Sequence, residues 1–278
     1  EISRGDWSSD VCSSDLTKTK IIKDVVDFEK GLYDTTFIPQ TLFRNNVSST
    51  FNILLNELEI KLIEKIQKDA KLLEEFFIHI SPGIDGNKEK YVAAEKVNEN
   101  YKPLLYGKNF SRYEISFDNQ YINYDRNLLN RAREEEIFTS KKIINQRISG
   151  GKRPLTCAID KDSYYTFNSV NNLVLKENVD IPLEYFAALL NSKLLSWYYS
   201  VMFSNKSTLT VNISKTFLSQ LPLVIDENRK LELQSLVRKL TTKDQANFKQ
   251  VDENIDTVIY EIYGLEQEEI EIIEESVN

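Results

Sequence analysis

The chain has 278 residues, of which 41% are hydrophobic and 28% are charged, and its formal net charge is −8. This length and apolar content allow one or two folded domains, and they exclude collagen-like, low-complexity and wholly disordered classes of protein. Residues 181–203 form the most apolar stretch, but polar residues interrupt it before the roughly 18 apolar residues that a membrane helix needs. Two Cys residues cannot build a disulfide framework.

The first sixteen residues differ in character from the rest of the chain. The stretch from Gly5 to Leu16, GDWSSDVCSSDL, is rich in Ser and Asp and has no apolar period. It resembles the conceptual translation of a sequencing adapter, and a genuine disordered tail is the alternative interpretation. We therefore exclude residues 1–16 from fold reasoning and expect Trp7 and Cys12 to be absent from the natural protein. On this interpretation, a natural segment upstream of residue 17 is missing.

Residues 17–80 are interpreted as a linker followed by a long amphipathic helix over residues 47–80. Lys and Glu lie between apolar residues that recur at near-helical spacing, namely Phe51, Leu55, Leu58, Leu62, Ile66, Leu73, Phe77 and Ile80. Ser48 or Ser49 supplies an N-terminal cap. The turn-forming pair that follows Ser81, Pro82–Gly83, ends the predicted helix.

Residues 81–180 change to a β-rich pattern. Gly, Asn, Asp and Lys punctuate short runs of β-branched and aromatic residues, which are KPLLYGKNFSRYEI, QYINY, KKIINQRI, LTCAID, YYTFN and NLVLK. These runs predict an antiparallel module of short strands. One helix is predicted inside the module, over residues 126–138.

The helical period returns over residues 181–278. One predicted face comprises Phe186, Leu190, Leu194, Trp197 and Val201. Further helices are predicted over residues 212–222, 228–241 and 251–277, the last with a break at Gly264. The predicted fold class is therefore α+β, with a β-rich module flanked by a long N-terminal helix and a C-terminal helical region.

Charge is distributed unevenly along the chain. The stretch from Lys102 to Lys176 carries thirteen basic and eight acidic residues, a net +5, whereas the stretch from Asp226 to Asn278 carries six and fourteen, a net −8. The densest basic run, KKIINQRISGGKRP, contains five basic residues and no acidic residue. The overall acidity argues against a general nucleic-acid coat protein, but it is compatible with a local basic face on the β-rich module.

The sequence offers no catalytic constellation and no metal site. His79 is the single His, and we interpret it as a packing residue in the last turn of the predicted helix. Cys157 lies in a predicted strand and is interpreted as a small buried hydrophobe. We find no His/Cys cluster with metal-ligand spacing, no G-x-G-x-x-G motif and no phosphate-binding loop. Adjacent prolines, as in the Asn-Pro-Pro-Tyr motif of amino-methyltransferases, are also absent from the sequence.

The basic run predicts a surface that contacts nucleic acid. Arg and Lys neutralise phosphates or reach guanine edges, and Asn reads adenine in a bidentate way. The candidate residues, taken from this run and from its basic and polar surroundings, are Lys108, Arg112, Lys141, Lys142, Arg147, Lys152, Arg153, Asn168, Asn171 and Asn172. We expect Arg147 to read a guanine near a strand end, and Lys152 and Arg153 to bind phosphate from the flexible SGGKRP turn. A plain solvated hairpin is the alternative.

Several segments carry motifs of one known family. The first contains Lys102, Pro103, Gly107, Arg112 and Tyr113, and the second contains Leu190, Asn191, Ser192 and Lys193. The run FLSQLPL and the tail IDTVIYEIYGLEQEEIEIIE follow in the family's order. Together, over about residues 40–278, they resemble the TaqI-like C-terminal specificity domain of adenine-specific DNA methyltransferases, a family that includes type IIG restriction-modification enzymes. The segment SPGIDGNKEKYV departs from the family's glycine-isoleucine segment, because it is short and lacks a threonine-glycine pair.

The resemblance implies that catalysis and DNA sequence recognition belong to separate domains. In this family an upstream domain binds S-adenosylmethionine and transfers its methyl group to the exocyclic nitrogen of adenine. The resemblance therefore implies a DNA sequence-recognition fragment that has no catalytic residue and no cofactor of its own and is inactive alone. S-adenosylmethionine is expected in the missing N-terminal domain, whose end would be residues 17–80. The implied partners are double-stranded DNA and that catalytic domain, in the cytoplasm and without a membrane. A separate module is needed because a catalytic pocket reads only the flipped base.

Three other interpretations stay open at this point. A specificity subunit of a type I restriction system has a similar β-rich domain and a leucine-x-x-leucine-proline element, but it normally carries two such domains joined by long helices. A helical adaptor would instead bind a protein partner through the acidic tail. A phage-defence methyltransferase relative shares the architecture within a larger chain. The sequence upstream of residue 17 distinguishes among them.

Overall fold

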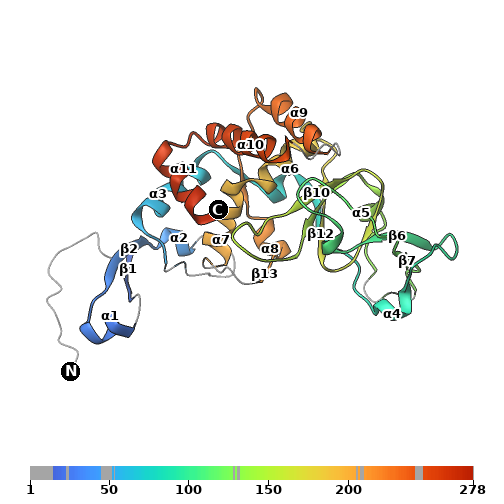
Figure 1. The fold of residues 1–278 in the computed structure, drawn as a ribbon, viewed down its shortest axis with the longest axis horizontal. Coiled ribbons are helices and arrows are strands. Elements are labelled where there is room, and N and C mark those ends of the chain that lie inside the picture. The colour runs from blue at the N-terminus through green and yellow to red at the C-terminus, as the bar shows by residue number, and fades with distance from the viewer. Residues whose placement is uncertain are drawn as a thin grey trace. The chain divides into compact units, whose positions relative to one another are not determined.

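The structure is a computed structural model that describes residues 15–22, 25–44, 52, 54–127, 129, 132–204, 206, 210–241 and 247–277. The chain divides into two compact units, residues 1–64 and 65–278. Both helices and strands are present, with helices towards both ends of the chain (Figure 1), so the α+β prediction is confirmed. Trp7, Cys12 and most of the adapter-like stretch lie outside the described residues.

The first unit contains a β-hairpin. Strand β1 (Leu16–Ile21) pairs antiparallel with β2 (Asp34–Pro39), and the short helices α1 (Val25–Lys30) and α2 (Thr41–Arg44) follow β1 and β2 in the chain. Exposed and partly buried side chains alternate along β1, as expected of a strand with one covered face. None of the side chains of α1 is buried.

Only part of the helix predicted over residues 47–80 is helical. Helix α3 covers Glu57–Lys68, while residues 45–51 and 53 lie outside the described part of the chain. The chain then forms β3 (Lys71–Leu72), a single 3-10 turn η3 (Leu73–Glu75) and β4 (Phe77–Pro82). The prediction was wrong here because the aromatic and β-branched run FFIHIS suits a pleated strand, and β4 finds a distant partner strand to pair with. His79 consequently lies on a strand and not in a helical turn.

The second unit contains two four-stranded sheets. The first has the order β10-β8-β12-β4 and is antiparallel throughout, with β8 at Lys142–Gln146, β10 at Cys157–Asp160 and β12 at Val170–Leu175. The second has the order β11-β6-β7-β5, with β5 at Val92–Ala93, β6 at Tyr101–Leu105, β7 at Tyr121–Asn123 and β11 at Tyr165–Thr166. Strand β11 pairs parallel to β6, which corrects the expectation of a wholly antiparallel module. Two small ladders join β9 (Ile148–Ser149) to β13 (Val211–Asn212), and β14 (Pro222–Leu223) to β3.

Strand β6 lies between two apolar clusters, because successive side chains of a strand point to opposite faces. Leu104 joins a cluster with Ile122, Phe138 and Tyr165, and Leu105 joins another with Ile144. All six side chains are at most 3% exposed. This double anchorage fixes the end of β6, where the loop of the candidate site begins.

Short helical segments complete the β-rich part, where a single helix over residues 126–138 was predicted. Helix α4 covers Lys88–Tyr91, the 3-10 turn η4 covers Gly107–Asn109, and α5 covers Glu136–Thr139. The helix predicted over residues 126–138 is therefore wrong for most of the residues that are described there. Its apolar residues Ile137 and Phe138 enter the core from the single turn of α5.

The C-terminal region is helical, as predicted. Its helices are α6 (Leu183–Asn191), α7 (Lys193–Phe203), α8 (Lys215–Leu218), α9 (Lys230–Leu240), α10 (Phe248–Ile262) and α11 (Gln267–Val277). Helix α6 packs against β10 and α9, while α10 and α11 both contact α7 (Figure 1). Gly264, with φ +62°, separates α10 from α11 as predicted. In the described ranges, no helix is long and apolar enough to cross a membrane.

Candidate nucleic-acid interface

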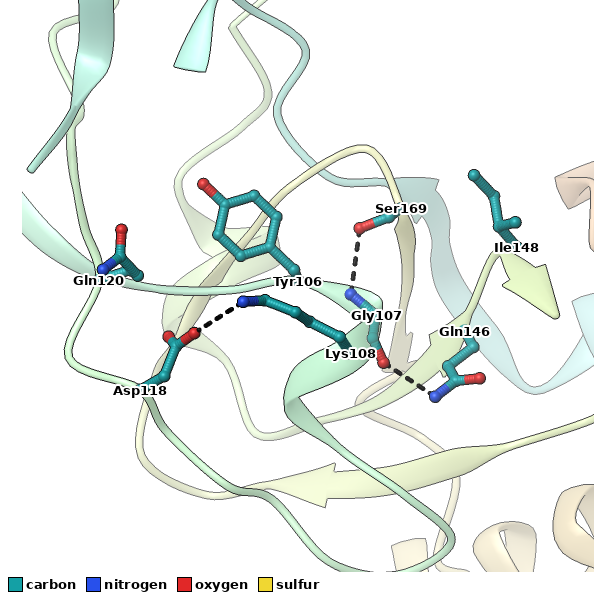
Figure 2. Close-up of a pocket in the computed structure, with 8 residues that line it drawn as sticks. All are labelled: Tyr106, Gly107, Lys108, Asp118, Gln120, Gln146, Ile148 and Ser169. Carbon is teal, nitrogen blue, oxygen red and sulfur yellow. Dashed lines mark hydrogen bonds and ion pairs between the residues drawn. The ribbon is translucent and has the colours of Figure 1, made fainter. Parts of the chain in front are cut away.

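An open pocket of about 670 Å³ lies where the loop after β6 meets the ends of β8 and β12. Eight residues line it, as Figure 2 shows: Tyr106, Gly107, Lys108, Asp118, Gln120, Gln146, Ile148 and Ser169. The lining combines an ammonium group, a carboxylate, two amides, two hydroxyls and an exposed aliphatic side chain. These groups match what base edges and phosphates offer as partners.

Hydrogen bonds hold the pocket loop in one conformation. The Gly107 N–H donates to Ser169 Oγ at 3.0 Å, and Gln146 Nε2 donates to the Gly107 carbonyl oxygen at 2.8 Å (Figure 2). Gln146 Nε2 also donates to the Phe110 carbonyl oxygen at 2.9 Å. A Cβ atom at Gly107 would lie 3.1 Å from the Ser169 carbonyl oxygen, so glycine permits this close approach of two backbone segments. Gln146 therefore acts on the pocket by fixing the backbone around Lys108.

Lys108 is the most exposed cation of the pocket. Its side chain is 72% exposed and pairs with Asp118 at 3.2 Å. Partial burial of Asp118 opposes its ionisation, but hydrogen bonds from Asn109 and Lys108 and the charge of Lys108 keep the pKa of Asp118 below its ordinary value. An exposed ion pair of this kind contributes little free energy, so Lys108 can exchange the carboxylate for a phosphate at small cost.

The predicted residues Arg147 and Asn168 adjoin the pocket, being the chain neighbours of the lining residues Gln146 and Ser169. Arg147 Nη1 donates to the Asn168 carbonyl oxygen at 3.2 Å, and Asn168 Nδ2 donates to Asp85 at 2.9 Å. Both side chains are partly exposed. Arg147 and Asn168 are thus next to lining residues in the chain, but they are not among the residues that line the pocket.

Lys141 and Lys152, two further predicted residues, are exposed. Lys141 precedes β8, and Lys152 lies in the loop that returns from β9 to β10. Gly151, next to Lys152, has φ +82°, a backbone conformation that glycine adopts without strain. Both lysines are accessible to a ligand, as the prediction requires.

Three of the predicted contacts were wrong, because their side chains are fully buried. Lys142 donates to Asp160 and to the carbonyl oxygens of Phe138 and Tyr164. Asn171 Nδ2 donates to the Ile213 carbonyl oxygen, and Asn172 exchanges hydrogen bonds with Thr166. A charge or amide that is buried needs such partners, and a base edge cannot reach it.

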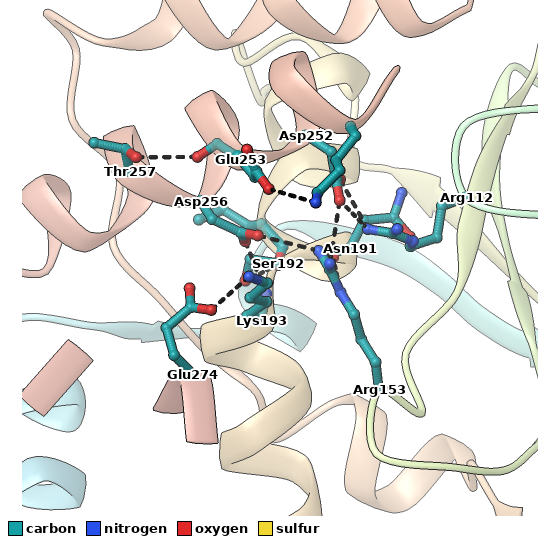
Figure 3. Close-up of polar contacts among 12 residues, drawn as sticks. Arg112, Arg153, Asn191, Ser192, Lys193, Asp252, Glu253, Asp256, Thr257 and Glu274 are labelled. Carbon is teal, nitrogen blue, oxygen red and sulfur yellow. Dashed lines mark hydrogen bonds and ion pairs between the residues drawn. The ribbon is translucent and has the colours of Figure 1, made fainter. Parts of the chain in front are cut away.

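The prediction that Arg112 and Arg153 contact nucleic acid is also wrong, because other groups of the chain hold both side chains. Arg112 pairs with Asp252, and Arg153 pairs with Asp252 and Asp256, so both guanidinium groups point towards α10 (Figure 3). Their side chains are only 25% and 16% exposed. The polar residues of the pocket that sequence reasoning missed are Tyr106, Asp118, Gln120, Gln146 and Ser169, although Gln146 lies within the basic run KKIINQRISGGKRP.

No group of His, Cys, Asp and Glu in the described part of the chain has a geometry that could hold a metal ion. Cys157 is a free thiol buried in β10, as expected, and burial raises its pKa.

Comparisons with known proteins bear on this surface. Residues 102–223 match the family model of the TaqI-like C-terminal specificity domain, which confirms the resemblance seen in the motifs, and this range contains the whole pocket. No curated protein matches the chain. Among solved structures, the type IIG restriction endonuclease BpuSI is similar, with 11% identity and a TM-score of 0.46 over 83% of this chain and 36% of its own. The chain thus spans little more than a third of the length of that enzyme.

Proposed function

We propose that this chain, whose residues 102–223 form a TaqI-like C-terminal specificity domain, recognises a specific sequence in double-stranded DNA for a restriction-modification enzyme. The observation that carries the proposal is the pocket beside Lys108, because it lies wholly inside the matched domain and presents cationic and amide groups on an open surface. Phosphate contacts position a protein on a duplex, and base-edge contacts specify the sequence. Lys108, Lys141 and Lys152 would contact phosphates, and Arg147 would read a guanine edge.

The amide of Gln120 and the hydroxyl of Ser169 would make the base-edge contacts that specify the sequence. A glutamine side chain can bond adenine in a bidentate way, and a serine hydroxyl can donate to or accept from any base edge. Figure 2 shows the Gln120 amide at one side of the pocket and Ser169 at the other. Burial, with the charge of Asp118 adding to it, raises the pKa of Tyr106, so its hydroxyl stays neutral and can donate as well.

The finer part of the proposal concerns the parent enzyme. We assign the chain to a site-specific adenine-N6 DNA methyltransferase in which a catalytic domain of the same parent chain holds S-adenosylmethionine. The residues described here would orient that domain on its site, and the assembly would work on cytoplasmic DNA. In a mixture of labelled S-adenosylmethionine and duplex DNA, we expect the chain alone to incorporate no label above background.

The test of recognition is selection from a duplex library with a randomised core. The full chain is incubated with the library at two salt concentrations, and the retained duplexes are sequenced. We expect one short sequence to be enriched, with affinity that falls steeply as salt rises. Equal retention of all sequences would contradict sequence recognition, and no retention at low salt would contradict DNA binding.

A further inference from the structure

Two arginines of the β-rich part and two aspartates of α10 meet in one buried cluster, shown in Figure 3. Arg153 Nη1 donates to Asp252 at 3.2 Å, and its Nη2 donates to Asp256 at 3.5 Å. Arg112 Nη1 donates to both carboxylate oxygens of Asp252, at 2.8 and 2.6 Å. The two carboxylates are almost completely buried, at 6% and 2% exposure for the residues.

Arg153 is held by backbone as well as by charge. Its Nε donates to the Asn191 carbonyl oxygen at 3.1 Å, and its Nη2 donates to the same oxygen. Asp256 also accepts from the Lys193 N–H at 2.9 Å, so the cluster joins the loop to the ends of α6 and α7 and to α10. A guanidinium group suits this place because its planar fork serves several acceptors at once, whereas an ammonium group is a point charge.

The cluster lies at one end of the loop that carries Lys152. At the other end, the Arg147 N–H donates to the Ser169 carbonyl oxygen at 2.9 Å, and the Arg147 carbonyl oxygen accepts from the Ile213 N–H at 2.7 Å. Gly150, Gly151 and Lys152 are exposed between these two anchors. The glycines give this stretch little stiffness of its own, so its position depends on how its ends are held.

We propose that Arg153 is a positioning residue, which Asp252 and Asp256 clamp so that the exposed Gly150–Lys152 loop is pre-organised to meet DNA. The proposal rests on the proposed function, and it replaces the earlier expectation that Arg153 binds phosphate. A loop that is already ordered loses less conformational entropy on binding. The smaller entropy loss increases the affinity for DNA, although Arg153 itself makes no contact with DNA. Arg112 acts in the same cluster by holding Asp252.

The first test is Asp252→Asn in the full chain, with Glu253→Gln as the matched control. Glu253 is the next residue on α10, and it makes the same charge change without touching either arginine. A clamp predicts that Asp252→Asn weakens duplex binding about tenfold and that the slope of affinity against salt is unchanged, because no phosphate contact is lost. If the arginines contact phosphate instead, Asp252→Asn releases them and binding becomes tighter, which would overturn the proposal.

The second test measures the loop without DNA. We expect Arg153→Lys, which keeps the charge and loses the fork, to leave the melting temperature within a few degrees of wild type while tryptic cleavage after Lys152 becomes at least several-fold faster. Arg153→Lys serves this purpose even if Asp252→Asn fails to fold, since the Arg112–Asp252 pair is intact in it. Cleavage and affinity equal to wild type in Arg153→Lys would refute the clamp. Failure of wild type to bind any duplex would refute the proposed function, and the cleavage result would still decide the clamp.

Discussion

Asn191 pairs with both backbone polar groups of Cys157. Its Oδ1 accepts from the Cys157 N–H at 2.8 Å, and its Nδ2 donates to the Cys157 carbonyl oxygen at 3.0 Å. The side chain thereby replaces a neighbouring strand at this point of β10. The next two residues continue the connection, since Ser192 caps α7 through the Leu195 N–H and the Lys193 N–H donates to Asp256. The leucine-asparagine-serine motif thus joins the sheet to the C-terminal helices.

Asn191→Asp should lower the free energy of unfolding by about 1–3 kcal/mol, because a carboxylate cannot donate to the buried Cys157 carbonyl oxygen. Urea denaturation of the full chain measures the change. The matched control is Asn212→Asp, the same substitution at an exposed position of β13. Equal stability of the two variants would show that the hydrogen bonds between Asn191 and the Cys157 backbone contribute nothing to the free energy of unfolding.

Lys142→Met should be severely destabilising. Desolvation lowers the pKa of Lys142 and raises that of Asp160, and the attraction between the two groups opposes both shifts. Removal of one partner from a buried pair costs about 3–5 kcal/mol, because the other is left uncompensated. Lys141→Met, at the exposed neighbour, should change stability by less than about 0.5 kcal/mol. The denaturant midpoints of the two variants give the comparison, and a fully stable Lys142→Met would contradict the burial of this residue.

The stability of the chain should depend on pH through Asp256. Burial raises the pKa of Asp256 to about 6 from an ordinary value of 3.8, although Arg153 and the Lys193 N–H oppose the shift. Between these two values, the folded state binds a proton that the unfolded state does not bind. The free energy of unfolding contributed by this group therefore rises as pH falls from 7 to 5, by at most about 1.4 kcal/mol per pH unit. Asp256→Asn should lack this contribution, and parallel urea titrations at pH 7 and pH 5 compare it with wild type. An identical pH dependence of the two proteins would refute the assignment.

Lys108→Ala tests the pocket as a phosphate contact. We expect weaker binding to all duplexes alike and a salt slope reduced by about one unit. Gln120→Ala should leave the salt slope unchanged and relax the sequence preference at one position, at a cost of about 1–3 kcal/mol for the preferred base. Binding assays at two salt concentrations, with the selected duplex and a scrambled one, separate the two effects. Wild-type behaviour of both variants would place recognition elsewhere on the domain.

Much of the fold could be predicted from local sequence, because the strand runs and the C-terminal helices follow their own apolar periods. One exception is the helix predicted over residues 126–138, of which only the single turn of α5 forms. Another is FFIHIS, whose spacing also fits a helix and whose strand conformation depends on pairing with β12, about ninety residues later. Parallel pairing of β11 with β6 likewise depends on residues that are far apart in sequence. Such long-range strand pairings cannot be predicted from the hydrophobic period and the secondary-structure propensity of a local segment.

The candidate site could be predicted only in part. The charge run predicted Lys141, Arg147 and Lys152, which stay at least partly exposed, but it could not show that Lys142 meets Asp160 inside the core or that Arg153 meets Asp252 from α10. The local sequence around a Lys or Arg does not show whether its partner is a phosphate or a carboxylate that is distant in the chain. Gln120 was missed for the converse reason, since an uncharged amide becomes a binding group only when the fold places it in a pocket.

Hydrogen exchange of the full chain, with and without its selected duplex, tests the proposal that the surface around the Lys108 pocket binds DNA. We predict that DNA slows exchange in the peptides that cover residues 106–120 and 146–152 and leaves the α11 peptide, residues 267–277, unchanged. A scrambled duplex at the same concentration should give weaker protection of the same peptides. Protection confined to the first unit, or to the C-terminal helices, would show that DNA does not bind at the pocket.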